Sequence, residues 1–101
     1  MKNLLTAAAV AAATLFSPWS AAQDAHLARN LAATCANCHG TDGQAKGAMV
    51  ALAGYPADRL VATMADFKAG KRPATIMHQI ARGYTEPQVA LIASHFAQQK
   101  P

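Results

Sequence analysis

The stretch Cys35-Ala36-Asn37-Cys38-His39 decides how this chain folds, because it joins the two cysteines and a histidine in one fixed pattern. It reads C-x-x-C-H, the attachment sequence of c-type haem. Residues three apart lie on the same side of a helical turn, so both thiols can add to the two vinyl groups on one haem edge. His39 can then bind the iron as its proximal ligand. The stretch therefore predicts one covalently attached haem c, held through Cys35 and Cys38.

Other uses of the cysteine pair fit the sequence less well. A zinc site would need a second pair of ligands at matching spacing, but there is no third cysteine, and His26, His78 and His95 stand apart. A thioredoxin-like redox pair would need a βαβ context, and no strand pattern is visible. A simple disulfide stays open as an alternative, although it gives His39 no role.

Length and composition narrow the fold class. The chain has 101 residues, of which 52% are hydrophobic and 14% charged, so it fits one domain and is too apolar for a disordered chain. Alternation of apolar and polar residues is missing, which argues against a β fold. The formal net charge of +4 comes without aromatic residues interleaved in a basic stripe, so nucleic-acid binding is not expected.

The N-terminal residues have the pattern of a secretory signal peptide. Lys2 precedes an apolar run from Leu4 to Phe16, and small residues at Ser20 and Ala22 fit cleavage after Ala22. The run is shorter than the roughly 20 residues that span a membrane. We therefore expect a signal peptide over residues 1–22, export to the periplasm, and a domain over residues 23–101 without a stable membrane span. An uncleaved anchor is the alternative.

Helical patterns fill the rest of the domain. A chain this short buries a small core and usually needs a cofactor, metal or disulfide to hold it together. We expect a small all-α fold of about four short helices around one haem. The expected helices run from Asp24 to about Cys38, from Pro56 to Gly70 and from about Thr75 to Arg82, with a loop over residues 40–54, and a Thr85–Gln88 capping box begins the last helix.

Apolar periodicity indicates which face of each helix is buried. In the first helix Leu27, Leu31 and Thr34 share a face. The predicted core faces of the second and last helices are formed by Leu60, Met64 and Phe67, and by Val89, Ile92, Ala93 and Phe96.

Met77 is the expected sixth ligand of the iron. A Met thioether opposite a His gives an electron-transfer haem of raised potential. Met64 lies on an apolar helix stripe, which favours a core role, and Met49 follows His39 too closely to reach the opposite haem face. Met77 follows a break at Pro73 and begins a short helix, so it can return over that face.

The remaining histidines have ordinary explanations. His78 follows Met77 directly and points elsewhere, because consecutive helical residues diverge by about 100°. We expect it at the surface or at the haem rim, His95 in a packing or surface position, and His26 in solvent. A haem with two His ligands is the less favoured alternative.

The motifs together resemble those of class I monohaem cytochromes c over the whole domain. The strings F-K-A-G-K-R-P-A-T-I-M at residues 67–77 and I-A-R-G-Y-T at residues 80–85 resemble the haem subunit of flavocytochrome c sulfide dehydrogenase. In that family a flavin (FAD) subunit oxidises sulfide and passes the electrons to the cytochrome subunit. The resemblance implies thioether attachment at Cys35 and Cys38, and His39 and Met77 as axial ligands.

The chain departs from this family pattern in two places. The loop after the haem motif lacks the usual prolines, so the backbone carbonyl that orients the proximal His39 is expected from Ala48 or a neighbour. The last helix has His95 where the family usually has an aromatic residue before Phe96, so the contact between the first and last helices is in question.

Three functions are compatible with these features. The favoured one is an electron-accepting haem subunit of a periplasmic dehydrogenase, with sulfide as the best specific substrate. A free carrier to a terminal oxidase or reductase is the second, and a gas-binding or catalytic haem with a displaceable sixth ligand is the third. No catalytic side-chain arrangement stands out, so the chain alone is not expected to be an enzyme. Lys68, Lys71 and Arg72 could steer an acidic partner, or be simply solvated.

Overall fold

The computed structural model describes residues 19–101, and most of the expected signal peptide lies outside these described residues. Residues 19–101 contain helices and no strand, which confirms the all-α prediction. The elements are α1 (Trp19–Ala33), α2 (Ala36–His39), the 3-10 turn η1 (Thr41–Gly43), α3 (Ala57–Lys68), α4 (Met77–Arg82) and α5 (Glu86–Ala97).

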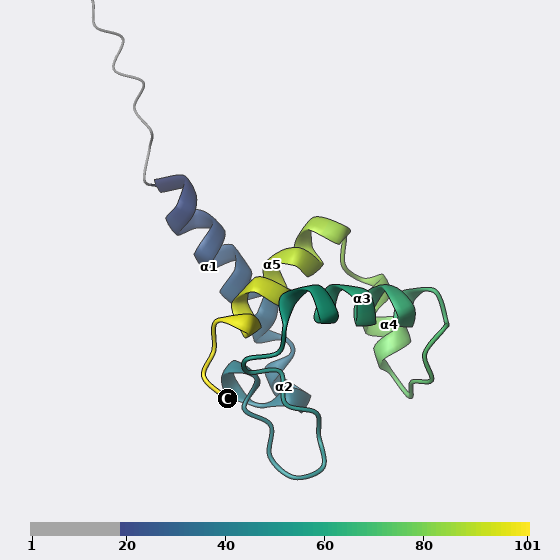
Figure 1. Cartoon of the computed structure of the whole chain (residues 1–101). Helices are drawn as coiled ribbons and strands as arrows, with labels where there is room; N and C mark the ends of the chain where they lie inside the picture. Colours follow the sequence, from purple (N-terminus) through teal and green to yellow (C-terminus); the bar gives the residue numbers. More distant parts are fainter. Residues whose placement is uncertain (1–18) are drawn as a thin grey trace, which may run out of the picture.

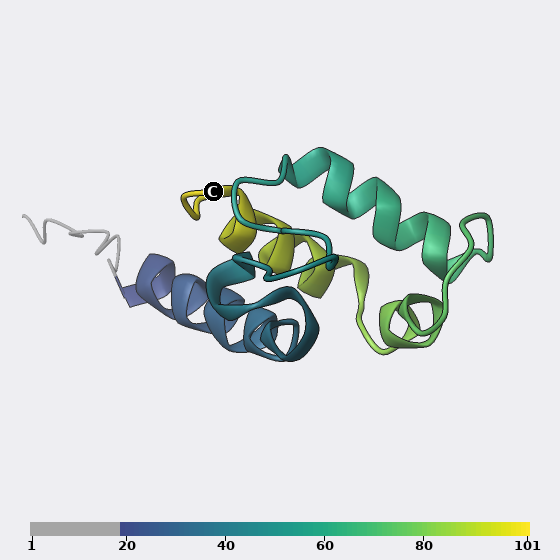
Figure 2. The ribbon, with the colours of Figure 1, turned by 90° about the horizontal axis from the view of Figure 1, so that it is seen from below.

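Helix α5 is the centre of the arrangement. It packs against α1 on one side and against α3 on another, and α3 in turn carries α4 at its far end (Figures 1 and 2). The loop that follows α2 runs beneath α5 before the chain enters α3 (Figure 1). The chain thus places α2 and α4, which hold His39 and Met77, in separate parts of the domain.

The core lies where α1, α3 and α5 meet. Its buried residues include the predicted faces of α3 and α5, so those two predictions are confirmed, and Phe67 packs against the cluster from its edge. Met64 has 9% of its surface exposed, which bears out its core role. The cluster consists of Ala32, Leu60, Met64, Ala81, Val89, Ile92, Ala93 and Phe96.

The predicted face of α1 is only partly correct. Within residues 24–33, Ala28 and Ala32 are the buried residues, whereas Leu31 is half-buried and packs against the core and Leu27 is 48% exposed. Close approach of two helix backbones requires small side chains, and α5 lies directly against this face. The alanines therefore form the contact, and the contact between the first and last helices is present although position 95 is His.

Both ends of α1 differ from the prediction. Asp24 lies inside the helix, which already begins at Trp19, and the helix ends at Ala33 rather than near Cys38. The hydroxyl of Thr34 donates to the Leu31 carbonyl at 3.2 Å, and the Cys35 N–H donates to the Ala32 carbonyl at 3.0 Å. These bonds take carbonyls that a continuing helix would use, so α2 starts as a separate turn.

The remaining helix ends follow their capping chemistry. Pro56 is the N-cap residue of α3 rather than part of its first turn, and Gly70 at φ 71° follows its C-terminal end. Helix α4 begins at Met77 and not at Thr75, because Ile76, at φ −138° and ψ −25°, lies outside the helical range of backbone angles. The Thr85–Gln88 capping box at the start of α5 is confirmed.

None of the helices within residues 19–101 has the length and apolar character needed to cross a membrane.

Candidate functional site

The two cysteines flank the start of α2. They form no disulfide within residues 19–101, and Cys35 is half-buried at the N-cap position while Cys38 is exposed. Burial raises the pKa of the Cys35 thiol, while hydrogen bonds from the Thr34 hydroxyl and the Cys35 backbone act in the opposite direction. The single turn of α2 thus separates the thiols by three positions, the spacing that haem attachment needs.

His39 is oriented by a backbone carbonyl. Its Nδ1 lies 2.7 Å from the carbonyl oxygen of Val50, and because a carbonyl can only accept, Nδ1 carries the proton. The other ring nitrogen, Nε2, is then the one with a lone pair for a metal. The sequence predicts this carbonyl from Ala48 or a neighbour, and the structure supplies it from Val50, two positions after Ala48.

Backbone hydrogen bonds, and not prolines, position the loop that carries the Val50 carbonyl. The carbonyl of Gly43 accepts from the N–H groups of both Leu52 (2.9 Å) and Ala53 (3.1 Å), which pins the returning loop to η1. Gly43 has φ 76°, and a Cβ there would lie 2.6 Å from the Ala53 nitrogen. Glycine is required at this position because the backbone is left-handed and the two segments touch.

The three methionines within the described residues occupy different surroundings. Met49 is 45% exposed in the loop, and Met64 is in the core. Met77 is half-buried at the first position of α4 and packs against the edge of the core cluster, as Cys35 also does. Of the three, Met77 therefore has the placement that suits a ligand partly shielded from water.

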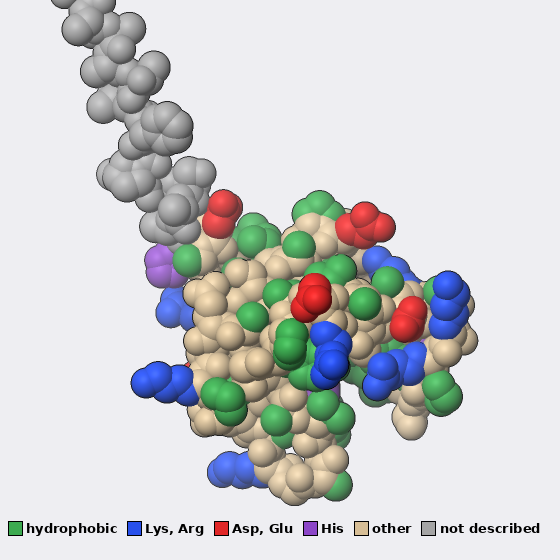
Figure 3. All heavy atoms as spheres, in the orientation of Figure 1, with side chains coloured by type: hydrophobic (Ala, Val, Ile, Leu, Met, Phe, Trp, Pro, Cys, Tyr) green, Lys and Arg blue, Asp and Glu red, His purple; other side chains and the backbone are tan. Residues whose placement is uncertain are grey.

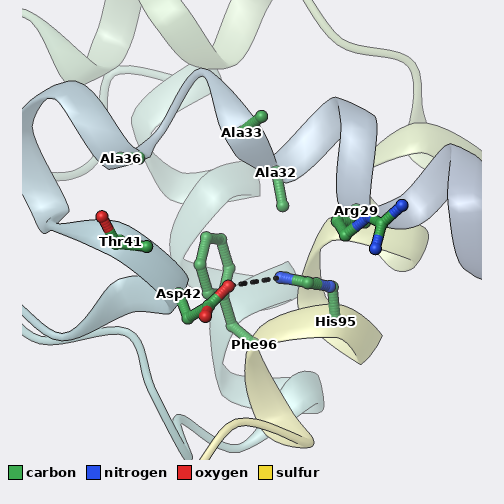
Figure 4. Close-up of a pocket in the computed structure, with 8 residues that line it drawn as sticks. All are labelled: Arg29, Ala32, Ala33, Ala36, Thr41, Asp42, His95 and Phe96. Carbon is green, nitrogen blue, oxygen red and sulfur yellow. Dashed lines mark ion pairs between the residues drawn. The ribbon is translucent and has the colours of Figure 1, made fainter.

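The histidines other than His39 are dispersed. His26 is exposed and lies 3.2 Å from an Arg29 nitrogen. His78 is half-buried, and within the described chain its Nδ1 is buried without a hydrogen-bond partner. His95 lies in the packing between α1 and α5, with its Nε2 3.9 Å from an oxygen of Asp42 (Figure 4).

His95 borders a shallow pocket of about 150 Å³ between α1, η1 and α5. Ala32 and Ala33 form one wall, and Phe96 lies beside the ion pair (Figure 4). His95 meets the Phe96 ring edge-on at a centroid distance of 5.3 Å. The packing role expected for His95 is thus confirmed.

The cations before Met77 are not equivalent. Lys68 donates from Nζ to the backbone carbonyl of Tyr84, so it is a partly buried structural group rather than a freely solvated charge. The Arg72 guanidinium lies 5.6 Å from the centre of the Phe67 ring. Lys and Arg side chains gather over the end of the molecule formed by α3 and α4 (Figure 3). Lys71 and Arg72 are exposed there.

Two contributions were missed from the sequence. Val50 acts through its backbone, which carries no residue-specific signal. Tyr84 bonds to Thr34 through its hydroxyl at 2.7 Å, across a separation of 50 positions. The Tyr84 ring also packs against the core. In the sequence, the importance of Tyr84 is indicated by its place in the I-A-R-G-Y-T string at residues 80–85.

Residues 25–99 match the model of the cytochrome c family, so the chain belongs to this family. It is 38% identical over 66 residues to the cytochrome subunit of sulfide dehydrogenase of Chlorobaculum tepidum, which covers 65% of this chain and 60% of that protein. It is 37% identical to cytochrome c4 of Pseudomonas aeruginosa, over 79% of this chain and 40% of that protein. The similarity to cytochrome c-554(548) of Halomonas halodenitrificans, at 31% identity, covers 78% of this chain and all of that protein.

The family defines the cofactor and the general activity. The chain carries covalently bound haem c and transfers electrons. The residues present fit that group, since two free thiols on one helical turn are followed by a His whose Nδ1 is already engaged. The resemblance to class I cytochromes c is likewise confirmed.

Proposed function

We propose that this chain is exported to the periplasm and serves there as the electron-accepting haem subunit of a flavin-containing sulfide dehydrogenase. In this proposal Cys35 and Cys38 attach the haem, and His39 and Met77 are its axial ligands. The observation that carries the ligand assignment is the 2.7 Å hydrogen bond from His39 Nδ1 to the Val50 carbonyl. It leaves Nε2 for the iron and makes the imidazole a stronger electron donor.

The bound haem would supply a one-electron couple between ferric and ferrous iron. The protein keeps the thiols, the imidazole and the thioether in place for it. Filling the sixth position with the Met77 thioether would favour electron transfer over binding of small molecules at the iron.

Two features support a sulfide dehydrogenase partner. The strings at residues 67–77 and 80–85 resemble the haem subunit of that enzyme, and one of the relatives is the cytochrome subunit of a sulfide dehydrogenase. The chain spans 60% of the length of that relative, so the shared partner and substrate are part of the proposal.

A free electron carrier is the second candidate. The observation that favours it is the match to cytochrome c-554(548), which this chain covers over its full length. The similarity to that cytochrome extends over its whole length, whereas it extends over 60% of the sulfide dehydrogenase subunit.

The exposed cations near Met77 support an acidic partner surface in either case. Lys71 and Arg72 are exposed beside the segment that leads into α4. Attraction between opposite charges raises the association rate and makes it sensitive to salt. Replacing both by Gln should lower the transfer rate at low salt and flatten its salt dependence. An unchanged rate and salt dependence would contradict the steering role.

The partner is tested by purifying the tagged protein gently from its own cells and recording the visible spectrum. Haem bands with a flavin contribution that bleaches on adding sulfide would support the dehydrogenase subunit. A low-spin haem spectrum without flavin, and a single band on a gel, would favour the free carrier.

The sixth ligand is tested with Met77→Ala. The variant should lose the low-spin spectrum of a His/Met haem, and its potential should fall, because the thioether favours ferrous iron. Met49→Ala is the matched control and should leave both unchanged. An unaltered spectrum and potential in Met77→Ala would refute the assignment and favour a haem that binds gas or performs catalysis.

A further inference from the structure

Tyr84 joins the two parts of the domain that carry the proposed iron ligands. It lies between α4 and α5, seven positions after Met77, and its hydroxyl is 2.7 Å from Thr34 Oγ1. Thr34 directly precedes Cys35 and the haem motif. The hydrogen bond therefore runs from the segment that follows α4 to the segment that starts the attachment site.

The contact between the two hydroxyls does not depend on which of them donates. The Thr34 hydroxyl also lies 3.2 Å from the Leu31 carbonyl, and when its single hydrogen is donated there, Thr34 accepts from Tyr84. Phenylalanine at position 84 would keep the ring and remove the Tyr84 hydroxyl.

The rest of Tyr84 is held as well. Its ring packs against the core cluster, its N–H donates to the Ala81 carbonyl at 3.3 Å, and its carbonyl accepts from Lys68 Nζ. The residue thus connects the end of α3, the end of α4 and the end of α1.

The opposite end of α4 is held by packing rather than by a side-chain hydrogen bond. Helix α4 begins at Met77, which packs against the edge of the core, with no side-chain cap at Ile76, and residues 71–76 before it are all exposed. The end of α4 next to Tyr84 is therefore the one that hydrogen bonds tie to the other segments.

We infer that Tyr84 is a positioning residue, which fixes the spacing between the haem attachment segment and α4 through its hydrogen bond to Thr34. In doing so it keeps the Met77 thioether on the iron. This inference rests on the proposed ligand role of Met77.

The test is a titration of the purified ferric holoprotein with imidazole, followed by the visible spectrum, because imidazole must displace the sixth ligand to bind. Tyr84→Phe should bind imidazole about three- to tenfold more tightly, the factor that one ordinary hydrogen bond provides. Thr34→Val should have the same effect, and the double variant should add little, because both changes remove one bond.

Tyr55→Phe is the matched control. Tyr55 also packs against the core at half burial, and its hydroxyl has no hydrogen-bond partner within residues 19–101. It should bind imidazole as the unmodified protein does.

Three results would overturn the inference, and they separate a wrong positioning role from a wrong ligand assignment. If Met77→Ala alters the spectrum but Tyr84→Phe and Thr34→Val bind imidazole normally, the positioning role is wrong and the ligand assignment stands. A lower unfolding temperature without tighter imidazole binding leads to the same conclusion, since it marks a purely structural bond. If Met77→Ala leaves the spectrum unaltered, the ligand assignment itself fails.

Discussion

At the scale of single residues, the site depends on partners that lie far away in the sequence. His39 takes its orientation from the Val50 carbonyl, and the Lys68 ammonium group donates a hydrogen bond to the Tyr84 carbonyl. Lys68 lies in the last turn of α3, where cations are usually solvated, yet its ammonium group is bonded to the segment between α4 and α5. Charge at a helix end therefore does not by itself mark a partner-binding residue.

This difference between neighbouring lysines can be measured. Lys68→Met keeps the aliphatic stem but leaves the Tyr84 carbonyl without its donor, so the free energy of unfolding should fall by about 1 kcal/mol. Lys71→Met, at an exposed position, should change it by less than about 0.5 kcal/mol. Denaturant unfolding of the holoprotein checks both values. Equal stability of the two variants would mean that the Lys68 bond contributes nothing.

At the scale of elements, the loop between α2 and α3 is held in its conformation by backbone hydrogen bonds instead of prolines. Prolines would restrict the backbone directly, whereas here the Gly43 carbonyl holds the Leu52 and Ala53 N–H groups. The left-handed backbone at Gly43 makes this close approach possible. The orientation of His39 is therefore a property of the loop as a whole.

Two glycines in this loop allow the cost of a left-handed backbone to be measured separately from the cost of a steric clash. Gly43 and Gly47 both have positive φ, at 76° and 70°, but a Cβ at Gly47 would meet nothing within 4 Å. Gly47→Ala should lower the free energy of unfolding by about 1 kcal/mol through backbone strain alone. Gly43→Ala should lower it by about 2 kcal/mol or more, because the added Cβ also pushes Ala53 away.

Gly43→Ala should also raise the reduction potential, and Gly47→Ala should not. A displaced loop weakens the hydrogen bond that His39 Nδ1 donates to the Val50 carbonyl, and a less basic imidazole stabilises ferric iron less. Potentiometric titration of both variants checks this. A potential that is unchanged in Gly43→Ala would show that the Val50 carbonyl does not tune the haem.

At the scale of the whole molecule, the packing of α1 on α5 holds the first and last helices together. Small residues on α1 let the helices approach, and the His95–Asp42 pair at 3.9 Å lies beside them (Figure 4). The pair sits at the edge of a shallow pocket and not in the core, so stability here comes from the close contact at Ala28 and Ala32.

Adjacent alanines on α1 test this contact. Ala32 is 3% exposed and Ala33 is exposed. Ala32→Leu should lower the free energy of unfolding by about 1–3 kcal/mol, because the added carbons cannot fit between α1 and α5. Ala33→Leu should change it by less than about 0.5 kcal/mol. Thermal unfolding of both holoproteins measures these changes. Equal losses of stability in the two variants would argue against close packing on this face.

Local sequence determined the chemistry and most of the helices. The C-x-x-C-H spacing, the capping box at Thr85 and the apolar faces of α3 and α5 are encoded within a few neighbouring residues, so a pattern over one or two helical turns is sufficient to identify them.

The tertiary structure alone decided the buried face of α1, the Val50 carbonyl beside His39 and the link from Tyr84 to Thr34. The face of α1 is set by how closely α5 approaches, which favours Ala28 and Ala32 over the larger Leu27. The other two depend on segments 11 and 50 positions apart meeting in space. Contacts of this kind are created by packing, and no local periodicity records them.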